Sequence, residues 1–249
     1  MKRWRWAAAS RIGTSHLKSG TRKQDAFSVK LLSENRLCAI VADGAGSASH
    51  GGQGASLVCR TLMSAFQKQF EMHDELPNEH TLSEWIDHIR DNLSAIAERR
   101  DLGKRDFAAT MVLLVTCKDR LLAAQIGDSA MVGRRDGRWE AICWPENGEF
   151  VSSTFFITDD VEARLRTAYL PLEYDAFALF SDGIDDVALE HLQLQPHARF
   201  FDPMIKPVDE ASERGNVRQL SVALARYLDS PALCERTDDD KTLVLLSSV

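Results

Sequence analysis

Aspartates recur in this chain where a short apolar run begins or ends. They are Asp25, Asp43, Asp128, Asp182 and the run 238–240. Carboxylates held on rigid elements are the oxygen ligands that Mg²⁺ and Mn²⁺ bind in proteins. Asp-Gly, which occurs at Asp43 and Asp182, is also a common turn dipeptide, so one such aspartate alone indicates only a turn. The repetition of the pattern along the whole chain is what favours a site for divalent cations.

The elements that must position these aspartates follow from the periodicity of the apolar residues. Short apolar runs rich in branched side chains predict strands at 37–42, 109–117, 121–126, 176–180 and 242–246. Apolar residues at steps of three and four predict helices over 54–70, 81–96 and 217–228, with a capping box at 81–84 and a loop at 76–80. The link at 118–120 predicts a hairpin, whose strands pair antiparallel. Two long helices placed as a block before a hairpin favour an α+β layered fold over a βαβ repeat.

The bulk composition limits the class of protein. The chain has 249 residues, of which 44% are hydrophobic, and this predicts a single domain over 1–249. Its formal net charge of −7 argues against a surface that follows nucleic-acid phosphates. No apolar run approaches the ~18 residues of a membrane span, and none of signal-peptide length follows the basic start. We therefore expect a cytoplasmic protein without nucleic-acid or membrane partners. Its five cysteines lack metal-binding spacing and are expected to be reduced core residues.

Six short motifs occur in order along the chain. They are Gln24-Asp25-Ala26, Val41-Ala42-Asp43-Gly44-Ala45-Gly46, Ala109-Thr110, Ile126-Gly127-Asp128-Ser129, Phe180-Ser181-Asp182-Gly183 and Asp239-Asp240-Lys241-Thr242-Leu243. This series resembles that of the type 2C, or PPM, metal-dependent serine/threonine protein phosphatases, in a divergent bacterial branch. Each motif is unspecific alone, but together they span nearly the whole chain in the order that is typical of the family.

The resemblance implies a four-layer αββα sandwich, in which two antiparallel sheets lie between helices and the metals bind at one end. It implies that Asp43 bridges two Mn²⁺ or Mg²⁺ ions and that Gly44 offers its carbonyl. Asp182 and Asp239 would complete the shell of one ion, and Asp128 corresponds to a ligand of a third ion in some members. Asp43, Asp182 and Asp239 are thus the expected catalytic set.

The chain departs from the family pattern at several positions. Gln24 stands where many members have glutamate, so the second ion would bind more weakly or depend on Asp25. The family's phosphate-binding arginine has no direct counterpart. Arg22 is the candidate for that role, and the alternative is a plain solvated cation. Ala45 stands where many eukaryotic members carry a histidine that can protonate the leaving group.

Two further features concern the leaving group and the substrate. His16 and His50 could replace the missing histidine, although each is more simply interpreted as a loop residue, and His50 lies closer in sequence to the first Asp-Gly motif. The segment 144–160 occupies the place of the family's substrate-recognition flap. We expect it to be a mobile flap that selects protein substrates, and the alternative is that Phe155 and Phe156 pack in the core.

The implied function is hydrolysis of phosphoserine and phosphothreonine in proteins by a hydroxide that bridges two metal ions and attacks phosphorus in line. The alternative is a pseudophosphatase that binds a phosphorylated partner or kinase without turnover, which Gln24 and the missing arginine would favour. The expected partners are a phosphorylated protein substrate and, by analogy with relatives, a cognate serine/threonine kinase. We expect the chain to be a monomer.

Overall fold

The computed structural model describes residues 3–146, 154–159 and 163–248. The strands are β1 (Trp4–Arg11), β2 (Ala26–Ser33), β3 (Arg36–Ala42), β4 (Met111–Cys117), β5 (Arg120–Ile126), β6 (Ala130–Arg135), β7 (Arg138–Cys143), β8 (Arg166–Pro171), β9 (Ala176–Phe180), β10 (Leu189–Glu190), β11 (Gln195–Pro196), β12 (Gly215–Asn216) and β13 (Lys241–Ser248). The helices are α1 (Thr14–Ser19), α2 (Gly51–Met72), α3 (Glu79–Arg99), α4 (Asp185–Ala188), α5 (Ala198–Glu210), α6 (Arg218–Leu228) and α7 (Pro231–Cys234), with 3₁₀ turns η1 (Lys104–Phe107) and η2 (Asp182–Ile184).

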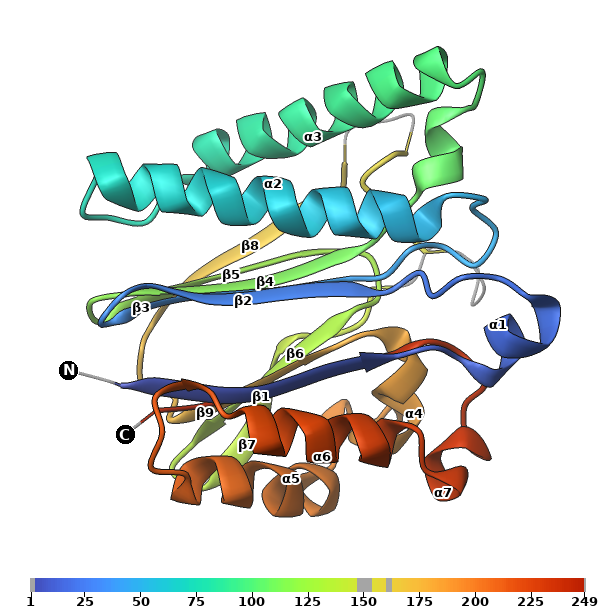
Figure 1. The fold of residues 1–249 in the computed structure, drawn as a ribbon. Coiled ribbons are helices and arrows are strands. Elements are labelled where there is room, and N and C mark those ends of the chain that lie inside the picture. The colour runs from blue at the N-terminus through green and yellow to red at the C-terminus, as the bar shows by residue number, and fades with distance from the viewer. Residues whose placement is uncertain (1–2, 147–153, 160–162, 249) are drawn as a thin grey trace.

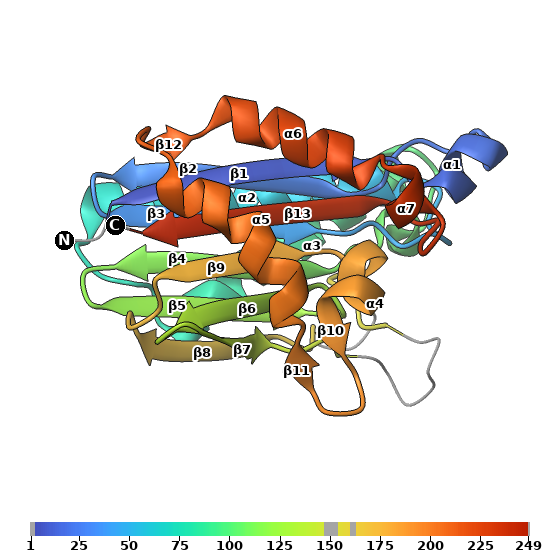
Figure 2. The same ribbon diagram turned by 90° about the horizontal axis from the view of Figure 1, so that it is seen from below.

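Two sheets lie face to face between two layers of helices (Figure 1). One sheet has the order β12-β1-β13-β9-β6-β7 and the other the order β2-β3-β4-β5-β8, while β10 and β11 form a separate hairpin. The long strands pair antiparallel, and the two-residue β12 pairs parallel with β1. Helices α2 and α3 cover the five-stranded sheet, and α5 and α6 cover the six-stranded one (Figures 1 and 2). The expected four-layer α+β sandwich is therefore confirmed.

Three apolar layers hold the sandwich together. Strand β3 contributes to two of them, because Ile40 faces the helices while Leu37 and Val41 face the opposite sheet, all with no exposed surface. Burial on both faces explains why the run around β3 is continuously apolar rather than alternating. The third layer lies between the six-stranded sheet and its helices, where Phe201 and Leu228 are fully buried.

Some expected boundaries were wrong. Helix α3 begins at Glu79, because the side chain of Asn78 accepts the Thr81 N–H at 2.8 Å, so the capping box at 81–84 and the loop to residue 80 are incorrect. Strand β1 was missed because its alanine-rich sequence has few branched residues, although it is buried between β13 and β12. Helix α5 was also missed, since it contains two prolines.

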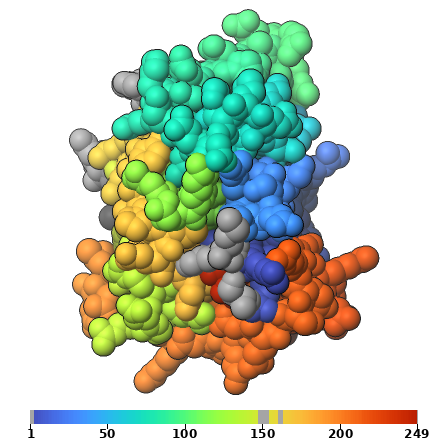
Figure 3. Space-filling model, turned by 90° about the vertical axis from the view of Figure 1, so that its left-hand side faces the viewer, coloured from blue at the N-terminus to red at the C-terminus, as the bar shows by residue number. Residues whose placement is uncertain are grey.

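Both chain termini lie at one end of the sandwich, and the strand ends that carry the aspartate motifs lie at the other (Figure 1). Figure 3 shows the end with the termini, where the α2–α3 turn lies above the ends of the sheets. No helix within the described ranges is long and apolar enough to cross a membrane.

Candidate metal centre

The five motif aspartates flank strands that are paired within the two sheets. Asp25 directly precedes β2 and Asp43 directly follows β3, its neighbour in the five-stranded sheet. Asp182 begins just after β9 and Asp239 lies just before β13, its neighbour in the six-stranded sheet. Asp128 follows β5. Because paired strands are antiparallel, an aspartate after one strand and an aspartate before the next reach the same end of the sheet.

Three of these carboxylates form an inner group, in which Asp25 is buried and Asp43 and Asp182 are half-buried. Asp25, Asp43 and Asp182 lie within hydrogen-bonding reach, with Asp43 between the other two. Burial raises the pKa of Asp43 well above its ordinary value, and the charges of Asp25 and Asp182 raise it further. Burial also raises the pKa of Asp182 to about 7. Asp25 is only 4% exposed, and burial raises its pKa despite opposing hydrogen bonds.

Asp128 and Asp239 form the outer part of the site. Burial raises the pKa of Asp128, whereas the hydroxyl of Thr154, which donates to its Oδ2 at 2.5 Å, lowers it. Asp239 is exposed, and its Oδ1 accepts the N–H of Asp240 at 2.7 Å. The negative charge of Asp239 raises the pKa of both Asp128 and Asp182, so the outer and inner groups act on one another.

Buried hydroxyl groups orient the inner carboxylates, a role that sequence reasoning did not assign. Asp25 Oδ2 accepts from Ser181 Oγ at 2.7 Å and from Thr242 Oγ1 at 2.6 Å. On the five-stranded sheet, Thr110 Oγ1 accepts the N–H of Asp43 at 3.2 Å, and the Thr110 N–H donates to the Asp43 carbonyl at 2.8 Å. The signal for these residues was present, because each is a small hydroxyl residue inside one of the six motifs.

The inner group has the properties of a cation site. Asp25 Oδ1 and Asp182 Oδ1 are buried without a hydrogen-bond partner. Within the described ranges, none of the five carboxylates forms an ion pair with lysine or arginine. Buried carboxylates without cations must share protons or bind a metal. A donor set made only of oxygen atoms suits Mg²⁺ or Mn²⁺, so the residues present fit these ions.

The loop after Asp43 approaches the start of α2 closely. A Cβ at Gly44 would clash with the backbone of Gly51, so only glycine fits, and the Gly44 N–H donates to the Gln24 carbonyl at 3.3 Å. The side chain of Gln24 is 96% buried: its Nε2 donates to the carbonyl of Ala48 at 2.8 Å, while its Oε1 is buried without a partner. Gln24 therefore holds this loop and leaves one oxygen without a donor.

Arg22 lies outside the inner group, on a cavity beside it. The cavity has a volume of about 600 Å³ and is lined by residues 21–24 and 46–53. Arg22 is exposed, and its guanidinium makes no ion pair or hydrogen bond to another described residue. Its side chain is free to meet an anion that enters the cavity.

The two candidate histidines differ in their surroundings. His50 contacts the hydroxyl of Ser49 at 2.8 Å and packs on Phe107 with ring centroids 5.2 Å apart. His16 instead lies beside the carboxylates, with its Nδ1 2.9 Å from Asp240 Oδ1 and close to Asp239. His16 reaches these carboxylates through the fold, although it is far from them in the sequence.

The segment 144–160, expected to be a mobile flap, falls partly outside the described residues, which here leave out 147–153 and 160. The part at 154–159 is anchored. Ile157 is fully buried in the core under α2 and α3, and its N–H donates to the carbonyl of Ala109 at 2.9 Å. Phe155 and Phe156 are half-buried, so neither belongs to the core. The expectation of a substrate-selecting flap therefore stays a prediction, with Ile157 as an anchor within 154–159.

Comparison with known proteins gives consistent matches. The family model described as Protein phosphatase 2C matches residues 12–229. Serine/threonine-protein phosphatase 3 of Escherichia coli (strain K12) is 36% identical over 247 residues, which cover 97% of this chain and 97% of that protein. Among solved structures, PppA of Pseudomonas aeruginosa has a TM-score of 0.68 and 20% identity, covering 99% of this chain and 98% of that chain. The catalytic domain of the serine/threonine protein phosphatase PstP, in complex with two manganese ions, has a TM-score of 0.60 and 21% identity, with 100% of both chains covered.

These matches differ in what they establish. The solved structures share too little sequence to indicate more than the fold. The family model covers most of the chain, and the Escherichia coli relative is similar over nearly its whole length. Together with the six motifs in order, they show that the chain belongs to the protein phosphatase 2C family of serine/threonine protein phosphatases.

Proposed function

We propose that this phosphatase hydrolyses phosphoserine and phosphothreonine in protein substrates with the help of Mn²⁺ or Mg²⁺ bound among its strand-end aspartates. The observation that carries the proposal is the inner group, in which Asp43 lies within hydrogen-bonding reach of both Asp25 and Asp182, and two buried carboxylate oxygens of Asp25 and Asp182 have no partner. The manganese ions in the similar PstP structure and the family of the chain support the metal requirement. A serine/threonine kinase must supply such a substrate.

The arrangement suggests a role for each ligand. Asp43 lies between two carboxylates and would be shared by two cations, with the carbonyl of Gly44 beside it. Asp182 and Asp239 come from the six-stranded sheet and would complete the shell of one cation. Asp25, on the five-stranded sheet, would serve the other cation. Asp128, at the outer edge, would hold a third, weaker cation.

When bound, the cations would lower the pKa of a coordinated water and offset the charge of the phosphoryl oxygens. The residues of the chain hold these groups in place. Ser181 and Thr242 keep the carboxylate of Asp25 in one orientation, because both donate to the same oxygen. Arg22 would bind phosphoryl oxygens from the neighbouring cavity, where its guanidinium can form paired hydrogen bonds.

A pseudophosphatase is the second candidate. It is favoured by Gln24, whose side-chain nitrogen is already bonded to Ala48, and by Ala45, which cannot protonate a leaving group. The retention of buried, unpaired carboxylates speaks against it, because such groups reduce stability and have no use without a cation.

The deciding experiment compares Asp43→Asn with wild type on p-nitrophenyl phosphate and on a phosphothreonine peptide, with and without Mn²⁺. We expect turnover that requires Mn²⁺ and a loss of about 100-fold or more in the variant, because a metal ligand contributes several kcal/mol to the transition state. Asp91→Asn is the matched control, since Asp91 is exposed on α3 and outside the proposed ligand set. Wild-type protein that binds Mn²⁺ and a phosphopeptide without turnover would establish the pseudophosphatase.

A further inference from the structure

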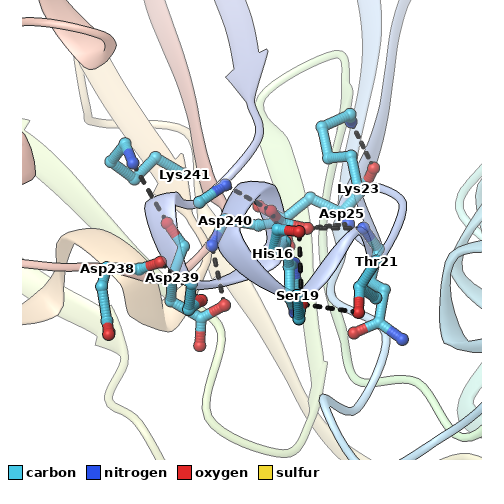
Figure 4. A network of polar contacts seen from close by, with 12 residues as sticks. His16, Ser19, Thr21, Lys23, Asp25, Asp238, Asp239, Asp240 and Lys241 are labelled. Atoms are coloured by element: carbon cyan, nitrogen blue, oxygen red, sulfur yellow. Dashed lines mark hydrogen bonds and ion pairs between the residues drawn. The ribbon is translucent and has the colours of Figure 1, made fainter.

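Asp240 is a buried carboxylate that the proposed ligand set does not use. It directly precedes β13 and is 1% exposed. Figure 4 shows it among His16, Asp25 and Asp239. Within the described ranges it forms no ion pair with lysine or arginine, and His16 Nδ1 lies 2.9 Å from its Oδ1. A buried acid of this kind requires several hydrogen-bond donors.

Those donors come from one segment, residues 13–25, which we call the N-terminal strap. Asp240 Oδ1 accepts from the Gly13 N–H at 2.6 Å and faces His16 Nδ1 at 2.9 Å. Asp240 Oδ2 accepts from the Gln24 N–H at 2.5 Å and from the Asp25 N–H at 3.4 Å. Both oxygens are thus occupied, unlike the unpartnered oxygens of Asp25 and Asp182. Asp240 is therefore suited to holding the chain rather than to binding a cation.

The N-terminal strap is the connection that crosses from one sheet to the other at the site. It links β1, in the six-stranded sheet, to β2, in the five-stranded sheet. Asp240 stands at the start of β13 in the six-stranded sheet, so its bonds to Gln24 and Asp25 join the two sheets. The N–H of Ser15 adds a further bond to the carbonyl of Asp238 at 2.9 Å.

We propose that Asp240 and His16 are a positioning pair that clamps the N-terminal strap onto β13 and so sets the separation of Asp25 from Asp239 across the two sheets. This rests on the proposed function, since the groups positioned are proposed ligands of different cations. The N–H of Asp240 also donates to Asp239 Oδ1 at 2.7 Å, so one residue orients a proposed ligand on each sheet. Groups that orient metal ligands commonly change metal affinity by about 10-fold to 100-fold when they are removed.

The clamp requires aspartate rather than asparagine. On Oδ2 both donors are backbone N–H groups, and on Oδ1 one donor is the Gly13 N–H. An asparagine has only one acceptor oxygen, so in either orientation its NH₂ group faces a backbone N–H. The amide therefore cannot satisfy all of the strap's donors.

The test measures Mn²⁺ binding directly, by the loss of the free Mn²⁺ signal in electron paramagnetic resonance, together with the Mn²⁺ dependence of turnover. We expect Asp240→Asn and His16→Ala to weaken Mn²⁺ binding by about 10-fold. For Asp240→Asn, the kcat at saturating Mn²⁺ should stay within about threefold of wild type, because the ligands themselves remain. His16→Asn should restore much of the affinity, since its side-chain nitrogen can take the place of Nδ1.

Two controls separate positioning from a general loss of stability. Asp238→Asn should bind Mn²⁺ like wild type, because Asp238 contacts the strap through its backbone carbonyl. Leu228→Ala, in the core under the six-stranded sheet, should lower the melting temperature without weakening Mn²⁺ binding. Wild-type Mn²⁺ affinity in Asp240→Asn and His16→Ala would overturn the proposal, as would loss of kcat with unchanged affinity. If Asp240→Asn does not fold, the Mn²⁺ affinities of the His16 variants decide the proposal. Wild-type protein that binds no Mn²⁺ would instead refute the proposed function.

Discussion

Surroundings, more than residue type, distinguish the aspartates of the metal centre from other aspartates in the chain. Burial raises the pKa of Asp182 to about 7, and the charges of Asp128 and Asp239 contribute to the increase. Asp106 shows the opposite case, because hydrogen bonds from Ser49 and Gly103 lower its pKa. A carboxylate whose pKa is raised in this way holds a proton in the metal-free protein and can exchange it for a cation.

Asp182→Asn and Asp239→Asn test the ligand assignment at single residues. We expect each to reduce Mn²⁺-dependent hydrolysis of p-nitrophenyl phosphate by about 100-fold or more, because an amide does not replace the charge of a metal-bound carboxylate. In EDTA, Asp182→Asn should raise the melting temperature, since it relieves repulsion within the buried group. Asp239 is exposed, so its variant should leave the metal-free melting temperature nearly unchanged. Near wild-type activity in either variant removes that residue from the ligand set.

Gln24→Glu tests whether the glutamine occupies the place of a family glutamate. We expect the added carboxylate to lower the Mn²⁺ concentration for half-maximal activity, because Gln24 Oε1 is buried without a partner. The metal-free melting temperature should fall, because the variant loses the hydrogen bond from Nε2 to the Ala48 carbonyl. A carboxylate oxygen of the new glutamate would then face that carbonyl oxygen and repel it. Gln24→Met, which also loses the bond to Ala48 but adds no charge, is the control. An unchanged Mn²⁺ titration would mean that this side chain does not reach a cation.

Among the elements, the ends of strands decide where the carboxylates meet. The start of η2 packs so closely on the start of β13 that a Cβ at Gly183 would clash with the carbonyl of Asp240. The glycine of the second Asp-Gly motif thus allows a close backbone approach and brings Asp182 beside Asp239. The segment 154–159 is a second positioning element, because Thr154 bonds Asp128 while Ile157 anchors the segment in the core.

Replacing both Phe155 and Phe156 by serine tests the substrate role of this segment. Both rings are half-buried, and Phe155 packs under the guanidinium of Arg164 at 4.6 Å. We expect kcat/KM to fall about tenfold on a phosphoprotein and to change little on p-nitrophenyl phosphate, because contacts far from phosphorus matter only for the larger substrate. Leu192→Ser, at a side chain that is 95% exposed on the β10–β11 hairpin, is the control. Equal losses on both substrates, with a much lower melting temperature, would assign the two phenylalanines to stability alone.

For the whole molecule, the proposed metal centre lies across the junction of the two sheets. Asp25 and Asp43 belong to the end of one sheet, and Asp182 and Asp239 to the end of the other. Cations bound there would connect the two halves of the sandwich, and a ligand that binds only the folded state stabilises it. Metal binding and global stability should therefore be coupled in this protein.

The pH dependence of stability measures that coupling. Burial and mutual repulsion raise the pKa of Asp43 and Asp182 above the value of about 3.9 for an unfolded aspartate, so the folded, metal-free protein binds more protons than the unfolded chain. Stability must then fall as pH rises from about 4 through about 7. We expect a metal-free melting temperature that is roughly 5 °C or more lower at pH 8 than at pH 5.5, measured in EDTA, and saturating Mn²⁺ should remove most of this difference. A metal-free melting temperature that rises with pH would contradict the raised pKa values.

The sequence alone determined the family, the layered fold and the candidate aspartates. Motif order is a property of the linear chain, and strands such as β3 that are buried on both faces carry continuous apolar runs. Strand β1 was missed because its burial depends on its neighbours β13 and β12 rather than on its own alanine-rich pattern. Helix α3 was placed correctly but began at the wrong residue, since its first turn depends on the side chain of Asn78.

The contacts around the candidate metal centre come from the tertiary structure. The fold brings His16 beside Asp240, although the two are 224 positions apart. Both carboxylate oxygens of Asp240 accept hydrogen bonds, whereas one oxygen of Asp25 has no partner. The fold also brings Ser181 and Thr242 from the opposite sheet onto Asp25. No local pattern encodes these contacts, because each depends on the approach of two sheets whose strands are far apart in the chain.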